Sequence, residues 1–295
     1  MAEQRLGLAT SDPGLVRRRV LETWDDFLAI AGQIDVGRPS RLPGWSGGDV
    51  LAHLASGGED APLERILASA RAGGAGPPLD VDADNARVVE RLRGSSSAQL
   101  LAGLTASRDA VAAFFSSAGY DTIALAPAVS PIGAIPVLTV LFAGTFELTV
   151  HALDLAPCGA PEPPARMLDA ALGAVTDSLG ALARRSRTPA RVSVLAPAGG
   201  WSVRGDADGW DTEQLAAAAR PDGPVARGSA HDLLDATSGR ANAASMLLRG
   251  RLEVADLRGF TALLPIVEET PAMPGGPMLR AAISVLKRVP RWARG

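Results

Sequence analysis

Apolar residues recur every three or four positions through most of the first half of the chain, and this spacing predicts amphipathic helices. The pattern is clear over residues 14–31 and returns over 83–93 and 98–115. Another helix is predicted to begin near Pro62, before a glycine- and proline-rich loop at 73–78. The first half is therefore predicted to be all helical.

The sequence around residue 46 marks the start of one more helix. Ser46 followed by Asp49 has the form of an N-terminal capping box, which predicts a helix running to about Ser56. Gly47 and Gly48 are poor helix formers for its first turn. His53 shares the apolar side of this helix with Val50 and is therefore expected to point inward.

Residues 124–146 form the most apolar stretch of the chain and pose the question of a membrane span. Pro127, Pro131 and Pro136 interrupt it, and the uninterrupted remainder is short of the roughly 20 apolar residues that a bilayer requires. We therefore expect no transmembrane span and predict a fully buried helix from about 136 to 156.

The second half differs in texture. A proline-rich hinge at 157–164 precedes a predicted helix over about 165–184, and the sequence then alternates as β-strands do. Strands are predicted at 191–195, 201–204 and 252–254, and helices at 229–248 and 278–289. The predicted fold class is α+β, with an all-helical domain at 1–160 and a smaller α+β domain at 161–295 that ends in a basic helix.

Composition narrows the protein class. The 295 residues are 47% hydrophobic with a formal net charge of −3, which excludes a disordered chain and argues against a nucleic-acid-binding protein. A single cysteine, Cys158, cannot form an intrachain disulfide. No secretory hydrophobic region follows Met1, so we expect a cytoplasmic protein. The oligomeric state is left open.

A polar stripe interrupts the predicted buried helix. Glu147, His151 and Asp154 recur at i, i+4 and i+7 and therefore lie on one side of it. Burying an unpaired carboxylate costs several kcal/mol, so the stripe needs a partner. A divalent metal held by Glu147, His151 and His53 would satisfy it, with an open fourth position and with Asp154 orienting His151. A glutamate–histidine hydrogen bond between helices is the alternative, and spacing alone leaves both open.

Two motifs carry a family resemblance. Residues 42–54 (LPGWSGGDVLAHL) and 146–155 (FELTVHALDL) resemble the signatures of mycothiol-dependent maleylpyruvate isomerases, within the DinB-like four-helix superfamily. Residues 230–240 (AHDLLDATSGR) and 248–254 (LRGRLEV) resemble the family's C-terminal domain, which is sterol-carrier-like. The resemblance implies a DinB-like four-helix bundle followed by a smaller sterol-carrier-like α+β domain.

The resemblance also implies a chemistry. It places a divalent metal, with zinc expected, on His53, Glu147 and His151, and it aligns Arg240 with an essential arginine of the C-terminal domain. Mycothiol is the implied thiol co-substrate. A metal-activated thiolate would attack a small electrophilic metabolite, and Arg240 would bind a substrate carboxylate.

The expected activity is S-transfer or thiol exchange, a role suited to secondary metabolism. One alternative is a mycothiol-dependent cis-trans isomerase of the maleylpyruvate type. Two others are a non-catalytic small-molecule binding protein and a metal-dependent hydrolase that activates water.

Overall fold

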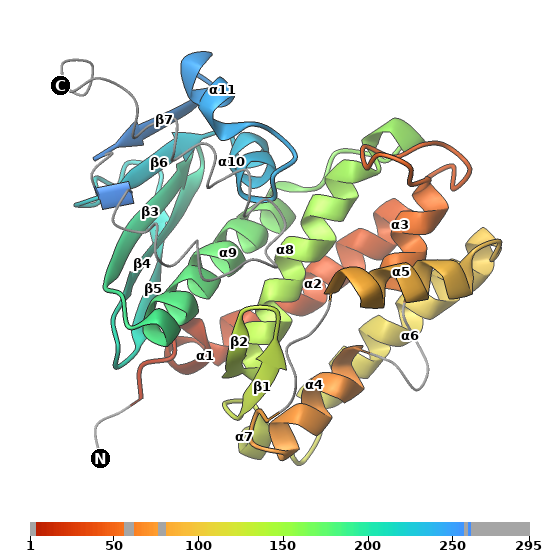
Figure 1. Ribbon diagram of the computed structural model, residues 1–295, viewed down its shortest axis with the longest axis horizontal. Helices are drawn as coiled ribbons and strands as arrows, with labels where there is room; N and C mark the ends of the chain where they lie inside the picture. Colours follow the sequence, from red (N-terminus) through yellow and green to blue (C-terminus); the bar gives the residue numbers. More distant parts are fainter. Residues whose placement is uncertain (1–3, 56–61, 76–80, 257–258, 261–295) are drawn as a thin grey trace. The chain divides into compact units, whose positions relative to one another are not determined.

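The computed structural model describes residues 4–55, 62–75, 81–256 and 259–260 (Figure 1). The chain divides into two compact units, one formed by residues 13–170 and the other by residues 1–12 together with 171–295. Helices dominate the first unit, and a β-sheet lies at the centre of the second. The predicted α+β fold class is confirmed.

The helical unit contains the helices that the apolar periodicity predicted, but the prediction of an all-helical first half is wrong, because residues 127–136 form a short antiparallel hairpin. In order along the chain, its elements are α2 (Pro13–Ala31), α3 (Gly47–Leu54), α4 (Pro62–Arg71), α5 (Val81–Leu92), α6 (Ser97–Phe115), α7 (Tyr120–Ile123), β1 (Pro127–Ser130), β2 (Gly133–Pro136), α8 (Val137–Asp154) and the 3-10 turn Ala156–Cys158.

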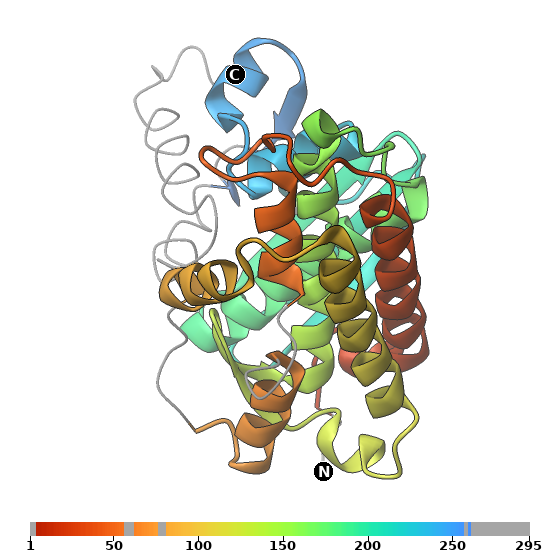
Figure 2. The ribbon, with the colours of Figure 1, turned by 90° about the vertical axis from the view of Figure 1, so that its right-hand side faces the viewer.

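One apolar core joins four helices of this unit. It includes Phe27 of α2, Leu51 of α3, Leu104 of α6 and Leu148 of α8, each at most 3% exposed. Figure 2 shows α2, α6 and α8 running alongside one another, with the shorter α3 beside them. Burying each such side chain contributes about 1.5–3 kcal/mol relative to leaving it in water, so this core sets where α3 and α8 lie.

Helix α8 is the buried helix that the sequence predicted. Among the described residues it is the one helix long and apolar enough to cross a membrane, and 72% of it is buried inside the protein. Two of the prolines before it belong to a β-hairpin that the sequence did not predict. Pro127 and Pro136 pair at the ends of the antiparallel hairpin β1–β2, where a residue that cannot donate a backbone hydrogen bond is tolerated.

The second unit is built on a mixed five-stranded sheet. Its strand order is β5-β4-β3-β6-β7, with β3 and β6 parallel and the other pairs antiparallel. The elements are α1 (Leu8–Ser11), α9 (Ala165–Ser186), β3 (Ala190–Ala196), β4 (Gly199–Gly205), β5 (Trp210–Ala216), β6 (Val225–Gly228), α10 (Ala230–Thr237), α11 (Ala243–Leu248) and β7 (Leu252–Ala255).

The division of the chain differs from the predicted boundary at 160/161. The units meet within α9, between residues 170 and 171, and the first twelve residues belong to the sheet unit. They do so because Gly7 N donates to Trp210 O (2.9 Å) and Trp210 N donates to Arg5 O (3.2 Å). Such pairing across 200 residues leaves no periodic signal in the sequence.

Other differences lie in the sheet unit. The helix predicted over 229–248 is two helices, because the chain turns at Gly239, whose φ of +73° favours glycine. Strands β5 and β6 were not predicted. The basic helix predicted at 278–289 lies outside the described residues.

A buried carboxylate holds the N-terminal segment to the sheet. Asp177 of α9 is 1% exposed, and its Oδ1 accepts hydrogen bonds from Leu8 N (3.2 Å), Trp210 Nε1 (2.9 Å) and Thr212 Oγ1 (2.7 Å). Its buried Oδ2 has no hydrogen-bond partner in the described part of the chain. Burial raises the pKa of Asp177 more than these three hydrogen bonds lower it.

The raised pKa of Asp177 predicts a pH dependence of stability. The folded protein favours the protonated carboxyl, so the free energy of unfolding should fall as the pH rises from about 4, the pKa of an unfolded aspartate, through the raised folded pKa. Asp177→Asn keeps the accepting oxygen and cannot ionise. We expect urea unfolding of the variant to depend less on pH, so that its stability relative to the native chain increases between pH 4 and pH 8. Equal pH slopes for the two proteins would contradict this.

Candidate metal centre

Helix α3 carries His53, and local interactions fix where it starts. Ser46 Oγ accepts from Asp49 N (3.2 Å) and the Asp49 carboxylate accepts from Ser46 N (2.8 Å), which confirms the predicted capping box. Such a cap contributes about 1 kcal/mol. His53 lies in the last turn of this helix, so the cap determines the position of its imidazole.

The glycine at the start of α3 lies in a closely packed position. A Cβ on Gly47 would lie 3.0 Å from Cys158 Sγ and 3.2 Å from Asp35 O. Its N–H donates to Arg38 O at 2.8 Å. The helix therefore begins against the loop that follows α2, and the poor helix propensity of glycine is the cost of this approach.

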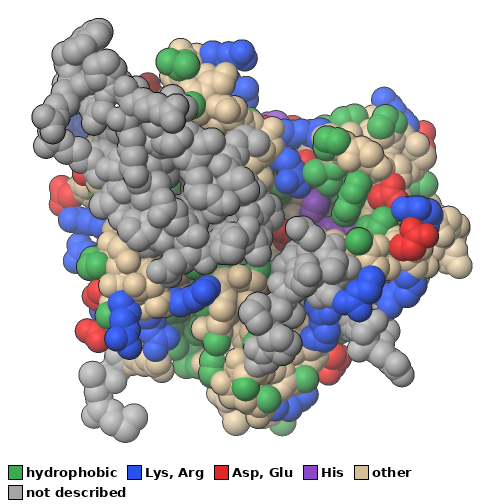
Figure 3. All heavy atoms as spheres, in the orientation of Figure 1, with side chains coloured by type: hydrophobic (Ala, Val, Ile, Leu, Met, Phe, Trp, Pro, Cys, Tyr) green, Lys and Arg blue, Asp and Glu red, His purple; other side chains and the backbone are tan. Residues whose placement is uncertain are grey.

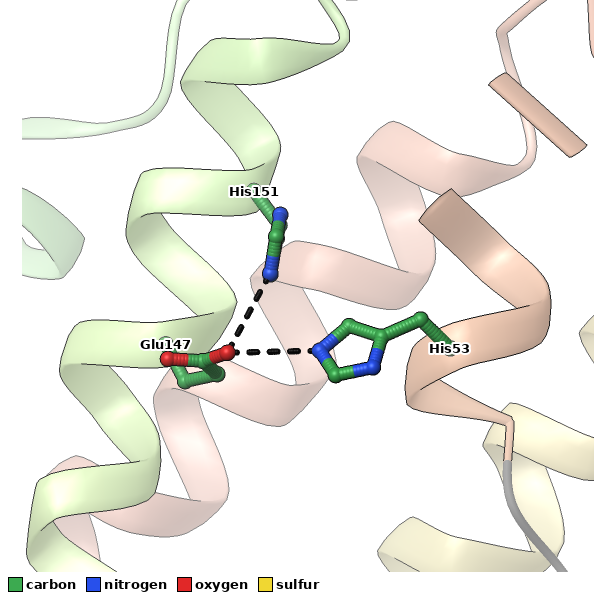
Figure 4. A group of neighbouring side chains, drawn as sticks. All are labelled: His53, Glu147 and His151. Carbon is green, nitrogen blue, oxygen red and sulfur yellow. Dashed lines mark hydrogen bonds and ion pairs between the residues drawn. The ribbon is translucent and has the colours of Figure 1, made fainter. Parts of the chain in front are cut away.

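The polar stripe of α8 meets His53 as its spacing requires. Nε2 of His53 and Nε2 of His151 each lie 3.2 Å from Glu147 Oε1 (Figure 4). Nδ1 of His151 lies 3.1 Å from Asp154 Oδ2, and Asp154 is fully buried. The imidazole rings of His53 and His151 are 4.9 Å apart at 72°, and Trp45 packs edge-on against His53 at 5.7 Å.

The donor atoms of these three side chains fit a small divalent cation. One ligand atom from each of His53, Glu147 and His151 lies within 4.8 Å of the others. In a tetrahedral zinc site with bonds of about 2.0–2.1 Å, neighbouring donor atoms are about 3.3 Å apart. Both histidine-to-glutamate distances, 3.2 Å, are close to that separation and also to the length of a hydrogen bond, so they fit a metal site and the hydrogen-bonded alternative alike. Imidazole nitrogens with one carboxylate are also the ligands of catalytic zinc sites.

The charges of the group support one another. Burial by itself would raise the pKa of Glu147, but hydrogen bonds with His151 and His53 outweigh it and hold the pKa well below the usual range. Burial by itself would lower the pKa of His151, but its bonds to Asp154 and Glu147 raise it to about 9. The carboxylate is therefore ionised at neutral pH, as a metal ligand must be, whereas His151 is protonated there and would release its proton on binding a metal.

The two histidines differ in the hydrogen bonding of Nδ1, the ring nitrogen that does not contact Glu147. His151 Nδ1 contacts Asp154, whereas the buried Nδ1 of His53 has no hydrogen-bond partner among the residues that the structure describes. A carboxylate bonded to a ligand histidine fixes its tautomer and orientation. His53 has no such carboxylate among the described residues, and Trp45 packs edge-on against its ring.

The group forms part of the wall of a pocket in the helical unit. The pocket has a volume of about 340 Å³ and is lined by Trp24, His53, Leu54, Pro62, Arg65, Asn85, Arg87, Val88, Arg91, Gly144, Glu147 and Leu148. Figure 3 shows histidine side chains deep in a hollow of this face. The Glu147 side chain is 39% exposed, against 10% for His53 and 6% for His151. A ligand in the pocket can therefore contact the group at Glu147, its most exposed member.

The remaining candidates lie elsewhere. Arg240 belongs to the sheet unit, between α10 and α11, where its Nη1 donates to Ser238 O (3.4 Å); its catalytic role stays a prediction. His231 of α10 lies 3.7 Å from the Asp235 carboxylate. Cys158 is buried, and burial raises the pKa of its thiol.

Sequence reasoning missed the other residues that line the pocket. Arg87 and Arg91, one turn apart on α5, have the spacing of an ordinary solvated helix face. Gly144 left one usable signal, because a glycine in the middle of a buried apolar helix costs about 1 kcal/mol relative to alanine.

Comparison with known proteins agrees with this architecture. Residues 10–156 match the model of the mycothiol maleylpyruvate isomerase N-terminal domain. The chain matches no sequence among curated proteins. Two similar solved structures are those of mycothiol-dependent maleylpyruvate isomerase (16% identity, TM-score 0.50) and of a histidine-to-alanine mutant of that enzyme (15%, 0.52), each covering 80% of this chain and 92% of the other. At such identities they support the fold alone. His53, Glu147 and His151 all fall within the matched residues, and the chain belongs to the mycothiol maleylpyruvate isomerase family.

Proposed function

We propose that this protein is a metal-dependent, mycothiol-utilising enzyme that transfers or exchanges a small thiol onto a small electrophilic metabolite. The observation that carries the proposal is the convergence of His53, Glu147 and His151, of which His53 and Glu147 line a pocket. Membership of a family named for mycothiol supports the identity of the thiol.

In this proposal His53, Glu147 and His151 hold one divalent cation, with zinc favoured by the nitrogen and oxygen donors. Three protein ligands leave a position for a further ligand, and a bound zinc ion would lower the pKa of a thiol there enough to supply thiolate at neutral pH. Asp154 keeps His151 oriented by holding its Nδ1.

The reacting sulfur comes from the co-substrate. Cys158 is the single cysteine of the chain. It is buried in the core near α3, and its raised pKa keeps the thiol protonated at neutral pH. A second substrate therefore supplies the nucleophile, which is consistent with a pocket beside the metal ligands.

The thiolate reacts with the electrophile by one of two routes. In S-transfer, sulfur forms a bond to an electrophilic carbon and the leaving group departs with its electron pair. In isomerisation, sulfur adds to a conjugated cis double bond, the resulting single bond rotates, and loss of the thiolate yields the trans alkene. The two similar structures are named as maleylpyruvate isomerase, and this name supports isomerisation as the alternative function. In either route Arg240 is proposed to bind a substrate carboxylate.

The metal assignment predicts the metal content of variants. His53→Ala and His151→Ala each remove one of three ligands, so we expect both purified proteins to hold less than about a tenth of the native zinc. His231→Ala is the matched control, since this histidine lies in the other unit, and it should keep full occupancy. Elemental analysis of the three proteins provides the measurement, and full occupancy in either ligand variant would contradict the assignment.

The role of Asp154 predicts weaker binding with unchanged stoichiometry. Asp154→Asn leaves all three ligands in place but loses the carboxylate that orients His151, so zinc affinity should fall about 10–100-fold. Competition with a chelator measures the affinity, and saturating zinc should still fill one site per chain. His151→Ala, by contrast, should not reach one site per chain. An unchanged affinity in Asp154→Asn would show that the His151–Asp154 contact has no part in metal binding.

The reaction class can be tested with mycothiol and two probes. These are maleylpyruvate and the activated aryl halide 1-chloro-2,4-dinitrobenzene. Mass spectrometry should show a sulfur conjugate for S-transfer, and proton NMR should show a sulfur-free trans isomer for the alternative, in both cases only with mycothiol and metal present. Turnover without thiol would indicate a hydrolase. Binding of both probes without turnover by the native zinc-loaded protein would indicate a non-catalytic binder. Either of these results would overturn the proposal.

A further inference from the structure

Arginine side chains dominate the charge of the pocket wall. Arg65 of α4 and Arg87 and Arg91 of α5 line it, whereas Glu147 is the one acidic side chain among the described residues that do so. Glu147 is engaged by His53 and His151, so its charge is offset within its own group. Three guanidinium groups and one carboxylate of the described residues therefore face a ligand that enters the pocket.

The two arginines of α5 are spaced to act on one ligand. Residues four apart lie on the same side of a helix, about one turn or 5.4 Å from each other. Arg87 and Arg91 line the pocket together with Glu147 of α8. A ligand in this pocket thus contacts α5 arginines as well as the proposed metal-binding group.

Guanidinium groups suit one kind of ligand group in particular. The planar fork of arginine matches a carboxylate with two parallel N–H···O bonds. All three arginines also interact with other groups of the protein. Trp24, Leu54, Val88 and Leu148 supply apolar surface in the same pocket, so a ligand with a hydrocarbon body and a carboxylate end is complementary to it.

Gly144 of α8 leaves open space in the same pocket. It lies within α8, three residues before Glu147, and a Cβ built on it would have no atom within 4 Å. This position is therefore not closely packed, unlike that of Gly47. A side chain at 144 would enter the pocket that Gly144 lines. Because the pocket is at the small end of the range for ligand sites, about 300–1,000 Å³, that space limits ligand length.

We propose that Arg87 and Arg91 bind the carboxylate of a small anionic co-substrate in this pocket, and that Gly144 sets the length of molecule accepted. The inference deepens the proposed function and rests on it, since the co-substrate is the electrophile that the thiol attacks. It assigns the selection of that electrophile to residues of the helical unit, in addition to any contribution from Arg240.

The charge requirement can be measured with succinate and its neutral diamide, succinamide, which have similar shapes and do not react with thiols. Calorimetric titration of the zinc-loaded protein should show succinate binding at least about tenfold more tightly than succinamide. Arg87→Gln or Arg91→Gln should remove most of that preference. Arg93→Gln is the matched control: Arg93 pairs with Glu90 at the surface (3.0 Å) and does not line the pocket, so the preference should persist. Equal binding of the two probes by the native protein, or an unchanged preference in both Arg87→Gln and Arg91→Gln, would overturn the proposal.

The length limit needs a second pair of variants. Gly144→Leu fills the pocket, and we expect it to weaken the binding of glutarate, which is one carbon longer, at least about tenfold more than Gly144→Ala does. Both variants should keep the native zinc content because neither touches a ligand atom. Equal glutarate affinities in Gly144→Leu and Gly144→Ala would overturn the role of Gly144.

The same titrations on the zinc-free protein separate this inference from the proposed function. Succinate binding that depends on Arg87 and Arg91 in a chain that takes up no zinc would support the arginine site and refute the metal-dependent function. A chain that takes up zinc and uses mycothiol, but binds succinate and succinamide equally, would retain the function and lose the arginine site.

Discussion

The burial of His151 and Asp154 on one side of α8, beside the half-exposed Glu147, is the constraint on which the helical unit depends. Glu147, His151 and Asp154 lie within a helix that is otherwise apolar. The helix can be buried only if their charges are satisfied. His53 completes the group from α3, and the resulting order Asp154–His151–Glu147–His53 leaves each carboxylate opposite an imidazole. The same contacts therefore satisfy the charges of α8 and build the candidate site.

The position of α3 follows from that requirement. The capping box at Ser46 sets its first turn, and Gly47 lets the turn approach Cys158 and the loop after α2. Leu51 on the same helix packs into the core that Leu148 of α8 also shares. Hydrophobic burial thus brings α3 against α8, and the polar stripe determines which imidazole meets which carboxylate.

The two glycines of the helical unit that bear on the site have opposite uses. Gly47 is closely packed, with its neighbours 3.0–3.3 Å from the place of a side-chain Cβ, and Gly144 faces open space in the pocket that His53 and Glu147 also line. In the other unit, one buried carboxylate oxygen of Asp177 in α9 accepts hydrogen bonds from both the N-terminal segment and β5. Gly47 and Asp177 thus each join local backbone structure to contacts made far along the chain.

The sequence by itself determined the elements whose signals are local. Apolar periodicity located α2 and α6, the Ser46–Asp49 box located α3, and the spacing of Glu147, His151 and Asp154 predicted a common side because helix geometry is fixed at 3.6 residues per turn. Only the tertiary structure decided what these elements face: that α5 brings Arg87 and Arg91 to the pocket of Glu147, that the first twelve residues join the sheet, and that Asp177 is buried beneath them. Such contacts join residues far apart in the chain, and they depend on packing, which no spacing within a single helix encodes.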